Sequence, residues 1–389
     1  MDKRKTDVFF ARLFMAASLV SVLALGAILL FVLAQGSAPF LLPTAPDIRI
    51  VTEGVAEITV NGRVYPSHTG FIPVPAGASA VSIAFSGKGG PRALSFTCAP
   101  GEAPVFTGYE GGKLTNPEAF VYTLSYSGAA AGLEQKVHVI MPEPAYRIGA
   151  FLFGLDWRPA YNKVYGILPM IAGTVLVSLG AILLGMPPAV LCGLFLAEFL
   201  SEKAAAVMRS GVEILAGIPS VVYGFFGLMV IVPGVKQIFQ APSGNGMVSA
   251  MLVLAMMLLP TVIVITETSL RAVPRPYREA SLALGATKMQ TAWHVVLPHA
   301  GSGVFTGVVL GISRAVGETM AVILVAGNSS QLPRSPLDSV RTLTATIALE
   351  MGYAQGRHSE MLFSIGITLF ALILGLNSLI LWMRRSAEA

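Results

Sequence analysis

The sequence predicts an all-α polytopic membrane protein with six transmembrane helices and a β-rich extracytoplasmic insert between helices 1 and 2. Three observations support this prediction. Of the 389 residues only 12% are charged and 54% are apolar, whereas soluble domains carry about 25% charged residues. Several apolar runs reach the roughly 20 residues that a helix needs to cross the hydrocarbon layer. The segment after the first run is instead polar, glycine-rich and broken into short β-like stretches.

Six apolar runs define the expected helices. Five contain no charged residue, and the sixth is apolar apart from Arg314 and Glu318. The five are 13–34, 168–197, 214–235, 247–266 and 361–383, and the sixth is 301–327. The first run exceeds the usual 7–15-residue core of a signal peptide, and we see no convincing small-x-small cleavage site before Pro39. We therefore expect an uncleaved first helix.

Basic residues predict the orientation. Lys3, Arg4, Lys5 and Arg12 precede the first run, and Arg384 and Arg385 follow the last. Because Lys and Arg concentrate on the cytoplasmic side of a membrane, we expect both termini to be cytoplasmic. The chain then divides into a tail with the first helix (1–43), an extracytoplasmic insert (44–150) and a transmembrane core (151–389).

The insert contains β-like runs at 48–51, 55–60, 81–85, 93–97, 120–126 and 136–140. Asn61-Gly62 lies between AEITV and RVYP and is typical of a type I′ hairpin turn. A docking role and a decorated loop without activity are both compatible with this pattern.

Pro187-Pro188 interrupts the second apolar run, which is longer than one crossing needs. Proline removes a helical hydrogen bond, so we expect the helix to kink or end there. The mixed charges of the following stretch predict that 189–209 continues as an elbow at the membrane interface.

A short polar segment, EASLALGATKMQTAWHVVLP, lies between two apolar runs on the predicted inner side. Its pattern predicts a helix from about 277 to 283, a turn at Gly285 and a second helix that ends before Pro298. Glycine suits the turn because it adopts positive φ at little cost, and proline is tolerated at the start of a following helix.

This segment resembles the EAA loop of ABC importer permeases, through Glu279, Ala280, Gly285 and Pro298, with Ser281 in place of the second alanine. The resemblance implies a MetI-like permease core. It also implies that the coupling segment, residues 277–300, inserts into a groove of an ATP-binding subunit, with Glu279 and Gly285 at the contact. The alternative is an ordinary interfacial loop.

Arg314 and Glu318 are four residues apart, so on one continuous helix they would share a face. Each would cost about 3 kcal/mol at the centre of a lipid-exposed helix. We therefore expect them to face the bundle or a water-filled path. A guanidinium suits an oxyanion, so a transport path is the favoured interpretation, and a buried ion pair that only fixes packing is the alternative.

Gly303, Gly307 and Gly311 form a stripe of small residues at four-residue spacing on the same predicted helix. Such a stripe allows a neighbouring helix to approach closely. We interpret these three glycines as packing positions.

Three stretches resemble the C-type (PstC-like) permease subunit of phosphate importers: RAVGETMAVILVAGN, LAGIPSVVYGFFG and TATIALEMGYAQG. The resemblance covers the first helix and about 165–385, whereas the long insert departs from it. It implies location in a bacterial inner membrane and import of inorganic phosphate by alternating access. The implied partners are a second homologous permease, a dimer of ATP-binding subunits, an extracytoplasmic phosphate-binding protein and membrane lipid.

The sequence lacks the motifs of an enzyme. There is no G-x-x-x-x-G-K-[ST] loop, no H-E-x-x-H spacing and no G-x-S-x-G elbow. We expect no cofactor or metal, ATP bound only by partner subunits, and no nucleic-acid partner. A permease for sulfate or molybdate, a self-sufficient secondary transporter and an additional sensing role remain alternatives.

Overall fold

The computed structural model describes residues 3–41, ten strands between 48 and 140, residues 145–160 and residues 163–388. It divides into two compact units. The first comprises Met1–Gly166 with Ala354–Ser364, and the second comprises Ile167–Tyr353 with Ile365–Ala389.

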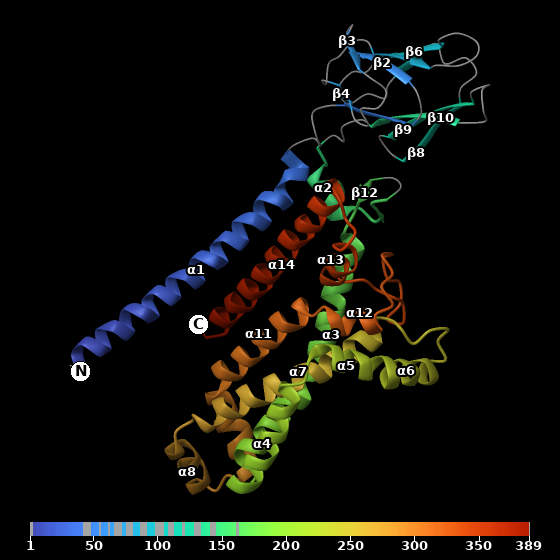
Figure 1. Cartoon of the computed structure of the whole chain (residues 1–389). Helices are drawn as coiled ribbons and strands as arrows, with labels where there is room; N and C mark the ends of the chain where they lie inside the picture. Colours follow the sequence, from blue (N-terminus) through green and yellow to red (C-terminus); the bar gives the residue numbers. More distant parts are fainter. Residues whose placement is uncertain are drawn as a thin grey trace. The chain divides into compact units, whose positions relative to one another are not determined.

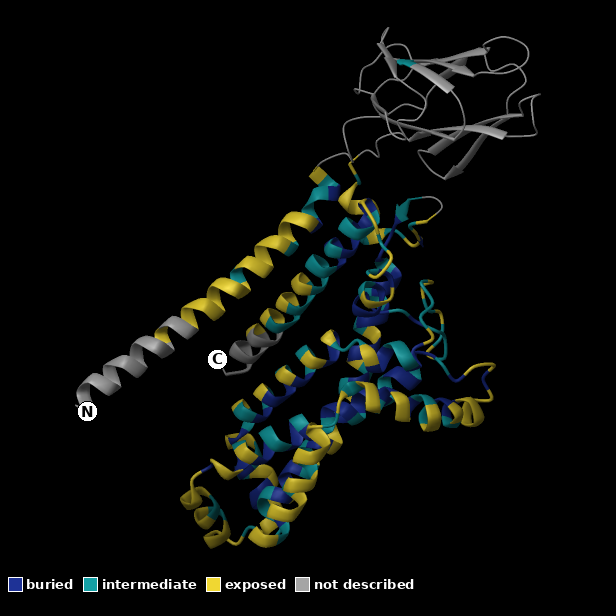
Figure 2. Cartoon of the chain, viewed as in Figure 1, coloured by how far each residue is buried: buried dark blue, intermediate teal, exposed yellow. Residues whose placement is uncertain are grey.

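The first unit begins with a long apolar helix, α1 (Lys3–Leu41), of which Ser18–Leu41 is long and apolar enough to cross a membrane. Most of its described side chains are exposed (Figure 2), as expected for a lipid-facing helix. Its end contacts the start of α14 (Arg357–Glu388): Ser364 Oγ donates to the Gly36 carbonyl over 2.7 Å. The Phe31 and Phe363 rings meet edge to face at 5.5 Å.

Ten strands form two antiparallel five-stranded sheets, ordered β4-β1-β10-β9-β8 and β3-β2-β5-β6-β7 (Figure 1). In β2–β3, Val60 pairs with Arg63, while Asn61 and Gly62 lie outside the described residues. The strands are β1 (Ile48–Glu53), β2 (Ala56–Val60), β3 (Arg63–Tyr65), β4 (Ile72–Val74), β5 (Val81–Phe85), β6 (Arg92–Thr97), β7 (Val105–Thr107), β8 (Lys113–Glu118), β9 (Val121–Ser127) and β10 (Glu134–Ile140). The unit also contains α2 (Ile148–Phe153), β11 (Trp157–Arg158) and β12 (Val164–Tyr165).

The second unit is built on two long helices, α3 (Leu168–Glu198) and α7 (Met247–Arg271), which pack side by side (Figure 1). Small residues bring them together: a Cβ at Gly185 would lie 2.9 Å from the Ala255 carbonyl oxygen. Their shared core includes Val177, Ala181, Val253 and Leu254, all almost fully buried.

Shorter helices surround this pair. They are α4 (Glu202–Ala216), α5 (Ser220–Phe226), the π-helix η1 (Gly227–Ile231), α6 (Val232–Phe239), α8 (Arg275–Ala283), α9 (Lys288–Thr291), the π-helix η2 (Ala292–Val296), α10 (Leu297–His299), α11 (Gly301–Gly317), α12 (Met320–Val325) and α13 (Leu343–Glu350).

Five helices in the described part of the chain are long and apolar enough to cross a membrane. They are Ser18–Leu41, Leu168–Glu198, Ser220–Phe239, Met247–Arg271 and Arg357–Leu379. A sixth is reached only if Lys288–His299 and Gly301–Gly317, which are bent by 69° at their junction, count as one span. The number six therefore stays a prediction.

α3 does not end at Pro187-Pro188 but continues through both prolines to Glu198, so the expected end of the helix there is wrong. Both prolines are exposed. Close contact with α7 continues beyond them, since a Cβ at Gly193 would lie 2.8 Å from Thr266 Cβ. The stretch 189–209 comprises the end of α3 and the start of a new helix, α4, whose first turn is capped by Ser201, and its expected place at the membrane interface stays a prediction.

Two other runs also differ from their expected limits. The run at 214–235 starts as a crossing helix only at Ser220, because Gly217 ends α4 and Pro219 precedes α5. The run at 301–327 is not one helix: α11 ends at Gly317 and α12 begins at Met320.

Candidate functional site: the coupling segment and the interrupted helix

The coupling segment forms two short helical stretches joined by a tight turn. Gly285 has φ +88°, the positive φ expected for it, and follows α8. The second stretch begins at α9, where Thr287 and Gln290 form a reciprocal capping box. Capping satisfies backbone donors that have no partner inside the helix, so this turn has a defined geometry.

The turn presents an exposed surface that mixes polar and apolar groups. Glu279, Ala280 and Gly285 are all exposed, and Leu284 is 90% exposed. Other large apolar side chains with about half their surface exposed are Tyr277, Leu282, Met289 and Trp293. Contiguous exposed apolar groups are typical of an interaction surface.

Arg278 attaches α8 to the transmembrane helices. Its guanidinium donates to Glu198 over 2.7 Å, to the Leu270 carbonyl over 2.7 Å and to the Val273 carbonyl. The sequence pattern did not single out Arg278. Its position directly before Glu279, at the start of the resemblance, is a signal that could have drawn attention to it.

A second bond closes the turn. Ser281 Oγ lies 2.9 Å from Thr291 Oγ1, so α8 and the end of α9 are linked by a hydrogen bond. Alanine at position 281 could not make this bond. Serine in place of the second alanine of the EAA pattern therefore adds a contact.

The second stretch does not end before Pro298 as expected. It passes through η2 into α10, with Pro298 in the first turn of α10, and bends at Ala300. A π-turn changes the hydrogen-bond register, and proline is tolerated where an N–H has no helical partner. Pro298 is exposed and lies one residue before the last residue of α10.

A buried carboxylate lies near the C-terminal end of α7. Glu267 accepts hydrogen bonds from Arg209 of α4 and, over 2.9 Å, from Arg271 of α7. The Glu267 side chain is only 2% exposed, and the bond to it raises the pKa of Arg209 above its ordinary value. The two guanidinium groups balance the charge of the buried carboxylate. The pair between Arg209 and Glu267 also joins α4 to α7.

Arg314 and Glu318 do not share a helix face, contrary to expectation. Glu318 follows the last residue of α11 and has an extended backbone, and no ion pair joins the two side chains in the described residues. Arg314 is exposed and donates to Thr261 Oγ1 of α7 over 3.2 Å. Glu318 instead accepts from the Ala321 amide of α12 over 3.2 Å.

The interruption between α11 and α12 is held by hydroxyl groups. Thr344 Oγ1 donates to the Glu318 carbonyl over 2.9 Å and lies 3.0 Å from Thr342 Oγ1. A backbone break at membrane depth needs such partners, because lipid offers none. The break lies within RAVGETMAVILVAGN, one of the stretches that resemble phosphate permeases. The apolar pattern of 301–327 did not predict it.

The glycine stripe of α11 lies against α7. A Cβ at Gly303 would lie 2.6 Å from Ser269 Cβ, one at Gly307 3.0 Å from Ile265 Cγ2, and one at Gly311 3.3 Å from Val262 Cγ2. These close approaches support the packing interpretation of all three glycines.

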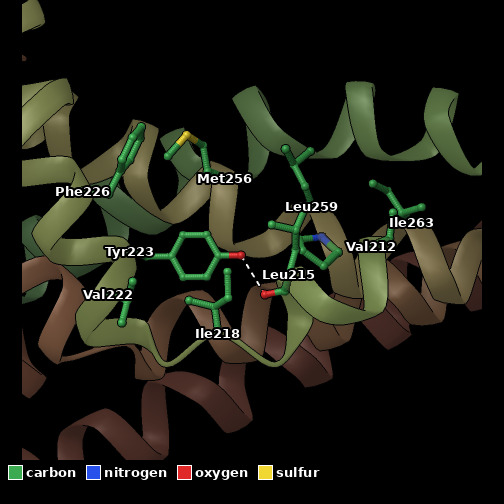
Figure 3. Close-up of a pocket in the computed structure, with 10 residues that line it drawn as sticks. Val212, Leu215, Ile218, Val222, Tyr223, Phe226, Met256, Leu259 and Ile263 are labelled. Atoms are coloured by element: carbon green, nitrogen blue, oxygen red, sulfur yellow. Dashed lines mark hydrogen bonds between the residues drawn. The ribbon is translucent and has the colours of Figure 1, made fainter. Parts of the chain in front are cut away.

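An apolar pocket of about 460 Å³ lies among α4, α5 and α7 (Figure 3). The Tyr223 hydroxyl donates to the Leu215 carbonyl over 2.8 Å, as Figure 3 shows. The lining residues are Val212, Leu215, Ile218, Val222, Tyr223, Phe226, Met256, Leu259, Pro260 and Ile263. An oxyanion needs hydrogen-bond donors or cations, so this pocket does not suit one. Among the described residues, no group of three or more His, Cys, Asp or Glu could hold a metal ion.

Several helices that are long and apolar enough to cross a membrane, together with the exposed turn of the coupling segment, define a polytopic membrane protein. Residues 189–388 match the family described as binding-protein-dependent transport system inner membrane component, and the chain belongs to this family. The match begins within α3 and includes the coupling segment, the interrupted helix and all of α14.

Individual relatives align over the same region. The chain is 38% identical over 225 residues to a probable ABC transporter permease of Bacillus subtilis, YqgH, covering 57% of this chain and 73% of the relative. It is 36% identical over 240 residues to the phosphate transport system permease PstC of Xylella fastidiosa, covering 57% and 74%. Among solved structures, the inward-facing MetNI methionine ABC transporter is 21% identical, covering 56% and 90%, with a TM-score of 0.40.

Proposed function

We propose that this chain is the transmembrane permease subunit of an ATP-driven, binding-protein-dependent importer of inorganic phosphate. Membership of the permease family and likeness to phosphate transport permeases support the proposal. The observation that carries it is the exposed α8–α9 turn, which bears Glu279 and Leu284 and is attached to the transmembrane helices by Arg278. Hydrolysis takes place in the partner, and this chain converts the partner's movement into alternating access.

The exposed position of Arg314 supports two parts of the proposal, a second permease subunit and an anion path. An exposed guanidinium on α11 is costly in contact with lipid, so another protein surface or water must cover it. A dimer of two homologous permeases provides both, with Arg314 facing the path between them. Its fixed charge attracts phosphate, and Thr261 holds the guanidinium in place.

Glu318 has a different role from the one first expected. Its carboxylate caps the backbone of α12 instead of pairing with Arg314, so it stabilises the interruption beside the path. Arg314 then keeps its full charge for the anion. Other transporters also build their binding sites from interrupted helices with non-helical backbone at membrane depth.

The remaining parts of the proposal concern partners and location. A dimer of ATP-binding subunits docks on the coupling segment, and an extracytoplasmic phosphate-binding protein delivers the anion. The chain lies in a bacterial inner membrane with both termini in the cytoplasm. The insert at 44–150 serves as a docking element for the binding protein, with decoration as the alternative.

Reconstitution tests the proposal. The chain is purified with its co-purifying subunits, placed in proteoliposomes and supplied with the binding protein and ATP. Phosphate should accumulate only with ATP and the binding protein, and excess sulfate or molybdate should not compete. Competition by either oxyanion would favour the other-oxyanion permease, and accumulation by the chain alone would favour a secondary transporter.

A further inference from the structure

The carboxyl end of α3 collects basic side chains from three later elements. Arg271 of α7 donates to the Leu196 carbonyl over 3.2 Å, and Arg278 of α8 pairs with Glu198 over 2.7 Å. Lys288 of α9 lies 5.5 Å from the centre of the Phe199 ring. A helix carboxyl end carries partial negative charge, so cations are favourable there.

The Glu198–Arg278 ion pair is the strongest of these contacts. Arg278 Nε lies 3.1 and 3.2 Å from the two carboxylate oxygens, and Nη2 lies 2.7 Å from one of them. The side chains are 9% and 20% exposed. Two-pronged pairing fixes direction as well as distance, and low exposure limits screening by water and salt.

Apart from Arg278, α8 is held by side-chain contacts within the coupling segment, including the Tyr277 ring at 4.3 Å from the His299 ring. No residue of α8 is buried, and Ser281 links it only to Thr291 within the coupling segment. Arg278 also bonds the Leu270 and Val273 carbonyls at the end of α7. Glu198 therefore provides a direct bond between α8 and α3, beside the apolar packing of η2 on the end of α3.

The other end of α3 is attached to the segment before α13. Thr174 Oγ1 accepts a hydrogen bond from the Leu343 amide over 2.9 Å, and Thr174 is 1% exposed. A Cβ at Gly173 would lie 2.6 Å from the Arg341 carbonyl oxygen, so the two backbones touch. Arg341 is itself held by Glu350 over 2.7 Å.

These contacts make α3 a continuous connection between the two ends of the second unit. The helix is unbroken over 31 residues, and its packing against α7 resists bending because close-packed interiors are stiff. We propose that Glu198 and Arg278 are positioning residues that lock the coupling segment to α3, so that its displacement shifts the Arg341–Leu343 end. This inference rests on the proposed function and names the route by which the partner's movement passes through this chain.

The test uses the assembled complex in proteoliposomes and measures phosphate imported per ATP hydrolysed. Glu198→Gln and Arg278→Gln should assemble and hydrolyse ATP, but the ratio should fall about tenfold, since removing one partner of a low-exposure ion pair is costly. Glu198→Asp, which keeps the charge, should restore much of the ratio. Glu202→Gln is the matched control, because Glu202 is exposed on the neighbouring first turn of α4 and should leave the ratio unchanged.

A merely local stabilising role predicts a different result. It would lower assembly or thermal stability while the surviving complexes keep a normal ratio, and that result overturns the proposal.

Thr174→Val provides a second test at the far end of α3 if the Glu198 variant does not assemble. It should also lower the ratio, and combined with Glu198→Gln it should add little, because both changes interrupt one connection. A normal ratio for Thr174→Val, or fully additive losses, would contradict the connection through α3. If the unmodified complex and Glu202→Gln import no phosphate, the proposed function itself fails, whatever the Glu198 variants do.

Discussion

Arg314 and Glu318 stand four residues apart but point to different partners, because α11 ends at Gly317 between them. Arg314 donates to Thr261 of α7, and Glu318 accepts from the amide of Ala321 in α12. Among the residues that the structure describes, no carboxylate forms an ion pair with this cation, which lies just before the interruption between α11 and α12. On a shared helix face the two side chains would pair with each other. Here Arg314 is available to an anion and Glu318 caps α12, so each role can be tested by its own substitution.

Replacing Arg314 with alanine should lower phosphate uptake about tenfold or more, since a lost charged hydrogen bond is worth about 1.5–3 kcal/mol. Assembly should change much less. Arg314→Lys keeps the charge and should retain part of the uptake, and Thr261→Val should have a smaller effect than either. Equal transport by purified Arg314→Ala complexes would show that Arg314 only fixes packing.

Glu318→Gln should be tolerated better than Glu318→Ala. Glutamine keeps an oxygen that can accept from the Ala321 amide, whereas alanine loses the cap at a cost of about 1 kcal/mol. The thermal midpoint of the purified complex in detergent measures the difference. If both variants lose stability and uptake equally, the negative charge matters, and the capping role is wrong.

Gly285→Pro should leave the membrane fold intact and abolish transport. Proline holds φ near about −65°, which is incompatible with the φ of +88° at this turn. Gly285→Ala is the milder variant: nothing lies within 4 Å of its Cβ, so it meets only a conformational cost of about 1–2 kcal/mol. Uptake and co-purification of the ATP-binding subunit are measured together, and normal uptake by Gly285→Pro would refute the coupling role.

Gly303→Ala should lower the thermal stability of the purified protein by about 1–3 kcal/mol through overpacking, because its Cβ would lie 2.6 Å from Ser269 Cβ. Gly301→Ala is the matched control on the same helix, since nothing lies within 4 Å of a Cβ there. An equal effect of the two substitutions would mean that α11 and α7 do not depend on this close approach.

Deleting residues 47–147 should weaken association with the binding protein and spare assembly of the permease with its ATP-binding subunits. Co-purification from membranes measures both. Unchanged capture of the binding protein by the shortened chain would leave decoration as the role of the insert.

Local sequence determined those features that depend on one stretch of chain. The length of the apolar runs predicted most of the helices that are long enough to cross a membrane. The glycine in the coupling segment predicted its turn, because glycine adopts positive φ at little cost. The four-residue spacing of Gly303, Gly307 and Gly311 likewise predicted a close helix contact, because spacing alone places small residues on one face.

Only the tertiary structure decided where helices continue, where they break and which charges meet. α3 passes through Pro187 and Pro188 because packing against α7 supports it, whereas the apolar run after Gly301 breaks at Glu318, where Thr344 satisfies the backbone. Glu198 meets Arg278 across 80 residues of chain. Such pairings depend on which distant segments pack together, and neither hydropathy nor periodicity records that information.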